Sequence, residues 1–235
     1  MDKRVSSVEE AVADIFDGAT VMVGGFGEAG SPIELLHALI DQGATDLTVV
    51  NNNTGSGEVG LAALIRAGRV SKMICSYPRT LNSTVFPELY QSGRTALDLV
   101  PQGTLAERIR AGGAGIPAFY TATSVGTPLE VGKERREIGG RDYVLEYALT
   151  ADFALIKAKV ADYHGNLIFN KTARNYSPVM ATAADATIVQ ASEVVPPGGI
   201  DPECVVTPGI FVDRIVIVAE PALESTLVAQ GASYP

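Results

Sequence analysis

The chain has 235 residues, of which 46% are hydrophobic and 19% charged, enough apolar sequence to bury a substantial core in one or two domains. Its formal net charge of −9 argues against a nucleic-acid-binding surface, because contacts to phosphate need clustered Lys and Arg. The charged N-terminus lacks the apolar core of a signal peptide, and no run of about 18 apolar residues predicts a membrane span. The two cysteines, Cys75 and Cys204, lie far apart and form no C-x-x-C motif, which fits a reducing compartment. We therefore expect a soluble cytoplasmic protein.

Strand-like apolar runs recur through the first half of the chain. They begin at intervals of about 25 residues, near Thr20, Leu47, Lys72 and Leu97. The segments between them carry helical periodicity, as at Leu35, Leu36 and Leu39. This alternation is typical of βα units around a parallel sheet. We therefore predict an α/β fold, with helices flanking an open and mostly parallel sheet over residues 5–111.

Residues 17–32 are the most informative stretch. A short buried strand at 20–23 runs into a turn whose glycines free the backbone from Cβ clashes, so that an oxyanion or a phosphate can approach it. These glycines are Gly24, Gly25, Gly27 and Gly30. Ser31, Pro32 and Glu34 match a helix N-cap, a first helical position and the end of a capping box. The helix N-terminus is then predicted to point into the glycine turn.

The second half of the chain is richer in hairpin signals. Residues 112–127 contain too much Gly, Pro and Thr for a helix and predict an ordered functional loop. The other predicted elements are a hairpin at 135–147 turning at Gly139 and Gly140, a hairpin of 153–157 with 167–170 around His164, Gly165 and Asn166, a helix at 177–184, and strands at 186–190 and 214–218. The hairpins make the predicted sheet mixed. We expect one domain over residues 1–235, with a hairpin-rich portion at 112–218 and a tail at 219–235.

Gly25, Gly27 and Gly30 also spell G-x-G-x-x-G after a strand, the weakest form of the dinucleotide-binding fingerprint. That fingerprint needs an acidic residue at the end of the second strand to bind the ribose, and asparagines stand there instead, at 51–53. A nucleotide-binding module is therefore an alternative that the sequence disfavours.

Amide side chains follow two of the predicted strands. Asn52 and Asn53 follow the second strand and Gln102 follows the fourth, at the edge where open α/β sheets bind ligands. Their amides can donate hydrogen bonds to a carbonyl oxygen or a carboxylate. The alternative for the asparagines is an Asx-rich turn that satisfies its own backbone. The residues alone leave both interpretations open.

Metal and charge-relay chemistry find little support in the sequence. His37 and His164 lack the spacing of metal ligands, and neither G-x-S-x-G nor a phosphate-loop motif occurs. Glu28 has no identified partner and is interpreted as a solvated turn residue. The basic cluster at 133–136 alternates with glutamates and is interpreted as a self-paired surface segment. From these motifs we expect no metal site.

Five segments carry a resemblance to a known family. They are D-G-x-x-V-M-V-G-G-F-x-x-x-G-x-P from Asp17, N-N-x-G from Asn52, P-Q-G-T-L-A-E-R-I-R-A-G-G-A-G-I-P-A-F from Pro101, D-F-A-L-I-K-A from Asp152 and G-N-L-I-F-N-K-T-A-R-N from Gly165. In these segments the chain resembles the family I coenzyme A transferases, and among them the A (alpha) subunits of 3-oxoacid CoA-transferases. The resemblance covers the chain from about residue 5 to residue 218.

The resemblance implies transfer of CoA from an acyl-CoA, usually succinyl-CoA, to a 3-oxo acid such as acetoacetate or 3-oxoadipate. In such enzymes a glutamate carboxylate attacks the thioester and forms a glutamyl-CoA thioester in a ping-pong course. The family motif that carries this glutamate, S-E-N-G, is absent, since Ser192-Glu193 is followed by Val194-Val195. The chain is then expected to need a B subunit that supplies S-E-N-G, in an A2B2 hetero-oligomer.

For this chain the resemblance implies support of catalysis without a nucleophile of its own. Gln102, Asn52 and Asn53 match the amide positions that stabilise an oxyanion, and coenzyme A is a substrate. The residues that match the CoA-binding segment are Gly24, Gly25, Phe26, Gly27, Glu28, Ala29 and Gly30. An acyl-CoA hydrolase on the same A/B scaffold is the alternative that keeps the fold, and the sequence leaves the acceptor acid open.

Overall fold

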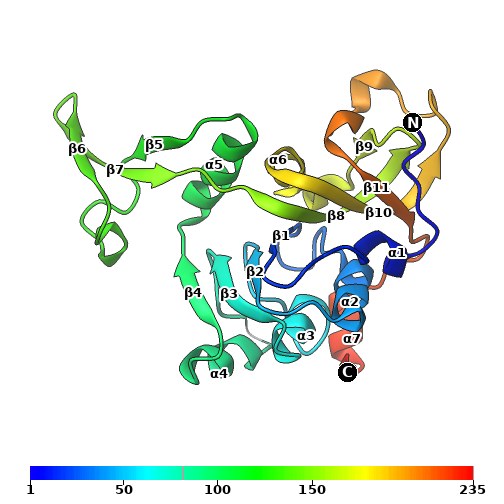
Figure 1. Cartoon of the computed structure of the whole chain (residues 1–235), viewed down its shortest axis with the longest axis horizontal. Coiled ribbons are helices and arrows are strands. Elements are labelled where there is room, and N and C mark those ends of the chain that lie inside the picture. Colours follow the sequence, from blue (N-terminus) through cyan, green and yellow to red (C-terminus); the bar gives the residue numbers. More distant parts are fainter. Residues whose placement is uncertain (81, 235) are drawn as a thin grey trace.

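The computed structural model describes residues 1–80 and 82–234. In this part of the chain the central sheet consists of β1 (Thr20–Val23), β2 (Leu47–Val50), β3 (Val70–Cys75), β4 (Ala96–Leu99), β8 (Ala151–Asp162), β9 (Leu167–Ile168), β10 (Ala184–Val195) and β11 (Arg214–Ile217). Seven strands lie parallel in the order β11-β10-β8-β1-β2-β3-β4, and β9 pairs antiparallel with β8 (Figure 1). The predicted α/β fold with a mostly parallel, mixed sheet is confirmed.

Helices cover both faces of this sheet. Side chains alternate along a strand, so that Val21 and Val23 of β1 enter one hydrophobic cluster and Met22 enters the other. The first cluster is covered by α1 (Val8–Val12), α2 (Ile33–Gln42), α3 (Gly60–Arg66) and α4 (Val85–Gln91), and the second by α5 (Gln102–Gly113) and α6 (Ser177–Ala183) (Figure 1). We call these two sides the α2 face and the α5 face. A last helix, α7 (Glu224–Ala229), lies near the C-terminus, and short 3-10 helices are η1 (Pro128–Glu130), η2 (Lys171–Arg174), η3 (Pro202–Cys204) and η4 (Gly209–Phe211).

The direction in which strands are added reverses between β1 and β8. From β1 the chain proceeds outward to β2, β3 and β4, whereas from β8 it proceeds to β10 and β11 on the other side. Val23 at the end of β1 pairs with Leu155, so β8 runs on past the end of β1 as far as Asp162. Because open α/β sheets bind ligands outside the carboxyl ends of strands at such a switch point, the segments after β1 and beside β8 are where a site is expected.

A separate antiparallel sheet projects from the body of the molecule. It consists of β5 (Ala118–Thr121), β6 (Arg135–Ile138) and β7 (Arg141–Tyr147), in the order β5-β7-β6 (Figure 1). The predicted hairpin with its turn at Gly139 and Gly140 is confirmed, but it does not join the main sheet. Its charges pair among themselves, as predicted for the basic cluster: Arg135 lies 2.5 Å from Asp142, Arg136 lies 3.2 Å from Glu134, and Lys133 lies 2.5 Å from Glu146.

The predicted loop at 112–127 is wrong in part. Gly112 and Gly113 are the last residues of α5, because the absence of a Cβ lets the helix contact the Leu149 carbonyl and the Thr182 side chain. β5 then lies within the remainder of that segment. Glycine was interpreted there as a helix breaker, whereas the fold uses it for close packing.

The predicted capping box is also wrong. The N-cap of α2 is Pro32, which makes no side-chain hydrogen bond, and the buried Ser31 precedes it in the turn. Glu34 instead accepts hydrogen bonds of 2.6 Å from Gln190 Nε2 and from the Ala222 N–H. Partners on β10 and on the C-terminal segment, distant in sequence, replace the local bonds that a capping box would make.

The other predicted elements are present with adjusted ends. The strands expected at 153–157 and 186–190 belong to the longer β8 and β10, and the hairpin of β8 with β9 is confirmed. The helix expected at 177–184 is α6. No helix among the described residues has the length and apolar character needed to span a bilayer. The interpretation as a single domain stays a prediction.

Candidate functional site

The glycine turn, residues 24–31, connects β1 to α2 at the switch point of the sheet. Its φ angles are positive at Gly25 (122°), Gly27 (58°) and Gly30 (86°), values that glycine adopts without a Cβ clash. The turn is closed by a hydrogen bond of 3.1 Å from the Phe26 N–H to the Ala29 carbonyl oxygen. The Ala29 N–H is part of the antiparallel bridge between Phe26 and Ala29, whereas the N–H groups of Gly27, Glu28 and Gly30 donate to no acceptor within the described parts of the chain. These three donors are therefore available to a bound oxygen.

Asn175, at the end of η2, holds the glycine turn from a position far away in sequence. Its Oδ1 accepts the Gly25 N–H at 3.2 Å, and its Nδ2 donates to the Ala29 carbonyl oxygen at 2.7 Å. One amide thus bridges both ends of the turn. Sequence reasoning missed this residue, although it ends one of the segments that carry the family resemblance.

The same segment explains two of the glycines. A Cβ on Gly30 would lie 2.5 Å from the Ala173 carbonyl oxygen, and a Cβ on Gly24 would lie 2.8 Å from Ser177 Oγ. Both glycines make room for the protein's own chain, and their predicted contact with coenzyme A stays a prediction. Gly27 differs, because nothing lies within 4 Å of a Cβ built there.

Asn52 and Gln102 come together on the α5 face. The Tyr176 hydroxyl lies 3.2 Å from the Gln102 carbonyl oxygen and 3.4 Å from Asn52 Oδ1, so that it donates to one of them at a time. Burial raises the pKa of Tyr176, which keeps the hydroxyl protonated and able to donate. Asn52 is buried, whereas Gln102 is exposed at the first position of α5. Sequence reasoning missed Tyr176, because nothing local marks it.

Asn53 lies in a different arrangement. Asn51 Nδ2 donates to the Val23 carbonyl oxygen at 2.7 Å, Asn51 Oδ1 accepts the Asn53 N–H at 2.8 Å, and Asn53 Oδ1 accepts the Gly55 N–H at 2.8 Å. This is the Asx-rich turn that the sequence left open as an alternative for the asparagines. The Oδ1 atoms of Asn51 and Asn53 are thus occupied by the backbone, and Asn52 is the asparagine whose side chain lies against the Tyr176 hydroxyl.

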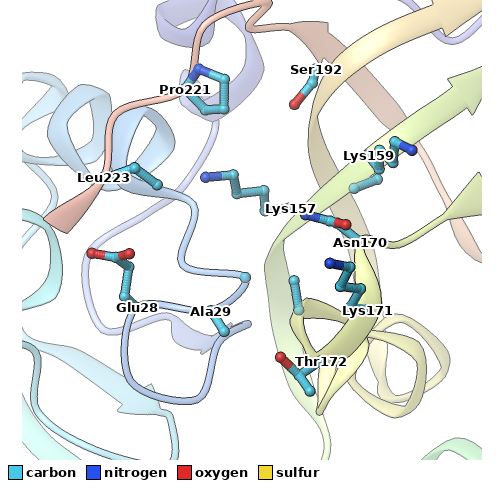
Figure 2. A pocket seen from close by; sticks show the side chains of 13 residues that line it. Glu28, Ala29, Lys157, Lys159, Asn170, Lys171, Thr172, Ser192, Pro221 and Leu223 are labelled. Carbon is cyan, nitrogen blue, oxygen red and sulfur yellow. The ribbon is translucent and has the colours of Figure 1, made fainter. Parts of the chain in front are cut away.

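A cavity of about 340 Å³ lies against the other side of the glycine turn. We call it the lysine cavity, after the lysines that line it together with residues of the turn and of the C-terminal segment (Figure 2). Its lysines are Lys157 and Lys159 of β8 and Lys171 of η2. Lys157 projects on the α2 face, because it alternates with Leu155 of that cluster and is two residues beyond it. The only sequence signal for this cavity is a lysine interrupting an apolar strand.

The acidic groups beside the lysine cavity are held by the protein's own donors. Glu28 accepts a hydrogen bond from the Ser225 N–H in the first turn of α7, a partner that sequence reasoning did not identify. Glu34 is held by its bonds from β10 and the C-terminal segment. Burial lowers the pKa of Lys157 below its ordinary value of 10.5, and the carboxylates of Glu34 and Glu28 oppose that shift.

The histidines occupy structural positions. His37 Nε2 accepts the Gly60 N–H at 2.9 Å, and its ring stacks on Tyr234 with the centroids 3.8 Å apart. Burial lowers the pKa of His37 and so favours the neutral ring. His164 contacts the Met1 backbone. Within residues 1–80 and 82–234, no group of three or more His, Cys, Asp or Glu side chains is arranged to hold a metal ion.

Comparison with known proteins identifies the family. The sequence pattern named coenzyme A transferase matches residues 5–217. The chain belongs to the coenzyme A transferase family. This coenzyme A transferase is 55% identical over 225 residues to the A subunit of 3-oxoadipate CoA-transferase from Pseudomonas putida, covering 96% of this chain and 97% of that one. It is 49% identical over 233 residues to the A subunit of a probable succinyl-CoA:3-ketoacid coenzyme A transferase from Bacillus subtilis, covering 98% and 97%.

Solved structures share the fold of this coenzyme A transferase. An acyl-CoA transferase of Escherichia coli O157:H7 superposes with a TM-score of 0.85 at 24% identity, over 94% of this chain and 48% of that one. The chain therefore spans about half the length of that enzyme. The specific roles of Asn52, Asn53, Gln102 and residues 24–30 stay predictions.

Proposed function

We propose that the chain is the A subunit of a 3-oxoacid CoA-transferase, which moves CoA from succinyl-CoA to a 3-oxo acid such as acetoacetate or 3-oxoadipate. The observation that carries this proposal is the 55% identity to the A subunit of a 3-oxoadipate CoA-transferase over nearly the whole of both chains. The reaction needs no permanently bound cofactor, and coenzyme A enters as a substrate. A cytoplasmic location stays a prediction.

The nucleophile in this proposal belongs to a partner. A glutamate of the B subunit, in its S-E-N-G motif, attacks the thioester carbonyl and displaces CoA thiolate, which leaves a mixed anhydride. The thiolate then attacks the glutamyl carbonyl and releases succinate, leaving a glutamyl-CoA thioester. The 3-oxo acid carboxylate reverses these two steps and departs as its CoA ester. An A2B2 assembly would contain two such sites.

In this proposal the chain supplies donors and positions them. Attack on the thioester concentrates negative charge on its carbonyl oxygen, and donors already in place stabilise that charge without rearranging. The Gln102 side chain is exposed at the start of α5, and the Asn52 amide is buried beside the same tyrosine hydroxyl. The N–H groups of Gly27, Glu28 and Gly30, which have no acceptor among the described residues, form a second set of donors for the coenzyme.

The test is an assay of the chain purified together with a B subunit that contains S-E-N-G. We expect CoA to move from succinyl-CoA to a 3-oxo acid, and the ratio of kcat/KM for acetoacetate and 3-oxoadipate to identify the acceptor. Replacing the S-E-N-G glutamate of the partner with glutamine should abolish transfer. Accumulation of free CoA without an acylated acceptor would indicate a hydrolase. Binding of NADH in the absence of any CoA transfer would indicate a nucleotide-binding module.

A further inference from the structure

The lysine cavity concentrates positive charge in an acidic protein. Three of the chain's six lysines line it, although the net charge of the chain is −9. Lys157, Lys159 and Lys171 form no ion pair and donate no side-chain hydrogen bond to any described residue. The lining contains one carboxylate, that of Glu28, which accepts a backbone N–H from α7. The lining therefore holds three cations and one carboxylate, and with Glu34 also acting on Lys157 the lysines still outnumber the nearby carboxylates.

The orientation of the side chains places two of these cations inside the cavity. Figure 2 shows Lys157 extending into the cavity toward Glu28 and Leu223. Lys171 and Asn170 lie across the cavity from Glu28 and Leu223. Lys159 is at the rim, and its amine points outward in the same view. Lys157 is half-buried, so an anion that reaches it leaves bulk water, and the interaction is screened less than at an exposed lysine. The volume of about 340 Å³ falls within the range of small-molecule sites.

The cavity and the amide cluster lie on opposite sides of the glycine turn. Lys157 belongs to the α2 face, whereas Asn52 continues the alternation of Val50 onto the α5 face. Val23, the last residue of β1, pairs with Leu155 of β8. Lys157 is two residues beyond Leu155, so it lies about 7 Å past the end of β1, alongside the turn. The N–H groups of Gly27, Glu28 and Gly30, which donate to no described residue, belong to this same turn. A long anionic substrate can thus contact both sides by crossing the turn.

We propose that the lysine cavity binds phosphate groups of the acyl-CoA substrate, with Lys157 and Lys171 as direct contacts and Lys159 adding charge at the rim. This inference rests on the proposed function. It assigns the phosphate-bearing end of coenzyme A to the α2 face of this chain, while the thioester lies across the turn near Gln102.

The test compares two thioesters in the assembled A/B enzyme. Succinyl-CoA carries the phosphates, and the succinyl thioester of N-acetylcysteamine lacks them. In the double variant Lys157→Gln/Lys171→Gln, loss of charge-assisted hydrogen bonds should lower kcat/KM for succinyl-CoA at least about tenfold, mainly through KM. The value for the truncated thioester and the KM for the 3-oxo acid should not change. Lys157→Arg should retain most of the succinyl-CoA activity.

Lys72→Gln serves as the matched control, because Lys72 lies near the start of β3, three strands away from β8 in the sheet, and also forms no ion pair with the described residues. An equal loss with both thioesters would overturn the proposal and assign the cavity to the acyl group. Unchanged kinetics with both thioesters would overturn it as well.

Should the wild-type complex transfer no CoA, the proposed function fails. Calorimetric binding of desulfo-CoA to the wild type and to the double variant still decides whether the lysines bind phosphate.

Discussion

The two sides of the glycine turn are built from different chemistry. On the α5 face, Asn52, Tyr176 and Gln102 form a neutral cluster in which one tyrosine hydroxyl contacts both neighbours. On the α2 face, the lysine cavity is open and charged, and its cations form no ion pair within the part of the chain that the structure describes. Fixed neutral dipoles suit a charge that exists only in a transition state. Permanent cations suit a charge that the substrate carries throughout.

Substitutions in the glycine turn should reduce stability more than substitutions on either face, because the arrangement of both faces depends on the shape of the turn. Gly30→Ala places a Cβ 2.5 Å from the Ala173 carbonyl oxygen at a φ of 86°. We expect the free energy of unfolding to fall by about 3–4 kcal/mol, from backbone strain together with the overlap. Chemical denaturation of the purified chain measures this.

Gly27→Ala is the matched control for Gly30→Ala. Gly27 also has a positive φ, 58°, but nothing lies within 4 Å of a Cβ there. Only the left-handed conformation is penalised, so the loss should be about 1–2 kcal/mol. Equal losses for the two variants would contradict the packing role assigned to residue 30.

On the α5 face, Gln102→Ala should lower kcat of the assembled enzyme about a hundredfold, or about 2.7 kcal/mol, by removing one oxyanion donor. Its side chain is exposed, so assembly and unfolding temperature should be preserved. Gln91→Ala, at an exposed glutamine that ends α4, controls for the loss of a surface amide. Wild-type turnover in a well-folded Gln102 variant would exclude it from catalysis.

Asn175→Asp tests whether the amide bridge maintains the turn. The carboxylate still accepts the Gly25 N–H, but it cannot donate to the carbonyl oxygens of Ala29 and Thr172 and repels both, which should cost about 1–3 kcal/mol near neutral pH. Repulsion raises the pKa of the new carboxyl in the folded state, so stability should recover as pH falls and the protonated group donates again. Unfolding of wild type and variant between pH 5 and 8 measures this. A deficit independent of pH would show that the Ala29 bond does not matter.

The smallest change in the free energy of unfolding is expected for a substitution of Glu224, beside the lysine cavity. Burial raises the pKa of Glu224 above its ordinary value of 4.5, with a further contribution from Glu28, while its bond from the Ser56 N–H opposes the shift. The folded state then binds the proton more tightly than the unfolded state, so this group's contribution to stability is present below pH 4.5 and is lost as pH rises through the folded pKa. Glu224→Gln should therefore raise stability at neutral pH, by no more than about 1 kcal/mol, and flatten this part of the pH profile. Thermal unfolding as a function of pH checks it, and a variant less stable than wild type at pH 7 would contradict it.

The sequence by itself determined the elements whose causes are local. Apolar runs and glycine pairs predicted the parallel strands and the hairpin at residues 139–140, and the family motifs predicted the nature of the enzyme. Predictions from local sequence patterns were wrong where residues distant in the sequence determine the contacts. The capping box at Ser31 gave way to bonds from Gln190 and Ala222, and Gly112 and Gly113 extended a helix because residues 149 and 182 lie against them.

Only the tertiary structure decided how the candidate site is assembled. Tyr176 joins Asn52 to Gln102, Asn175 bridges the turn, and Lys157 faces away from that cluster. These contacts join residues far apart in the sequence, and no propensity or spacing encodes them, because they depend on the order of strands in the sheet. The face toward which each strand's side chains point likewise depends on the helices packed against it. The glycine turn could be found in the sequence, but its division into a neutral side and a charged side could not.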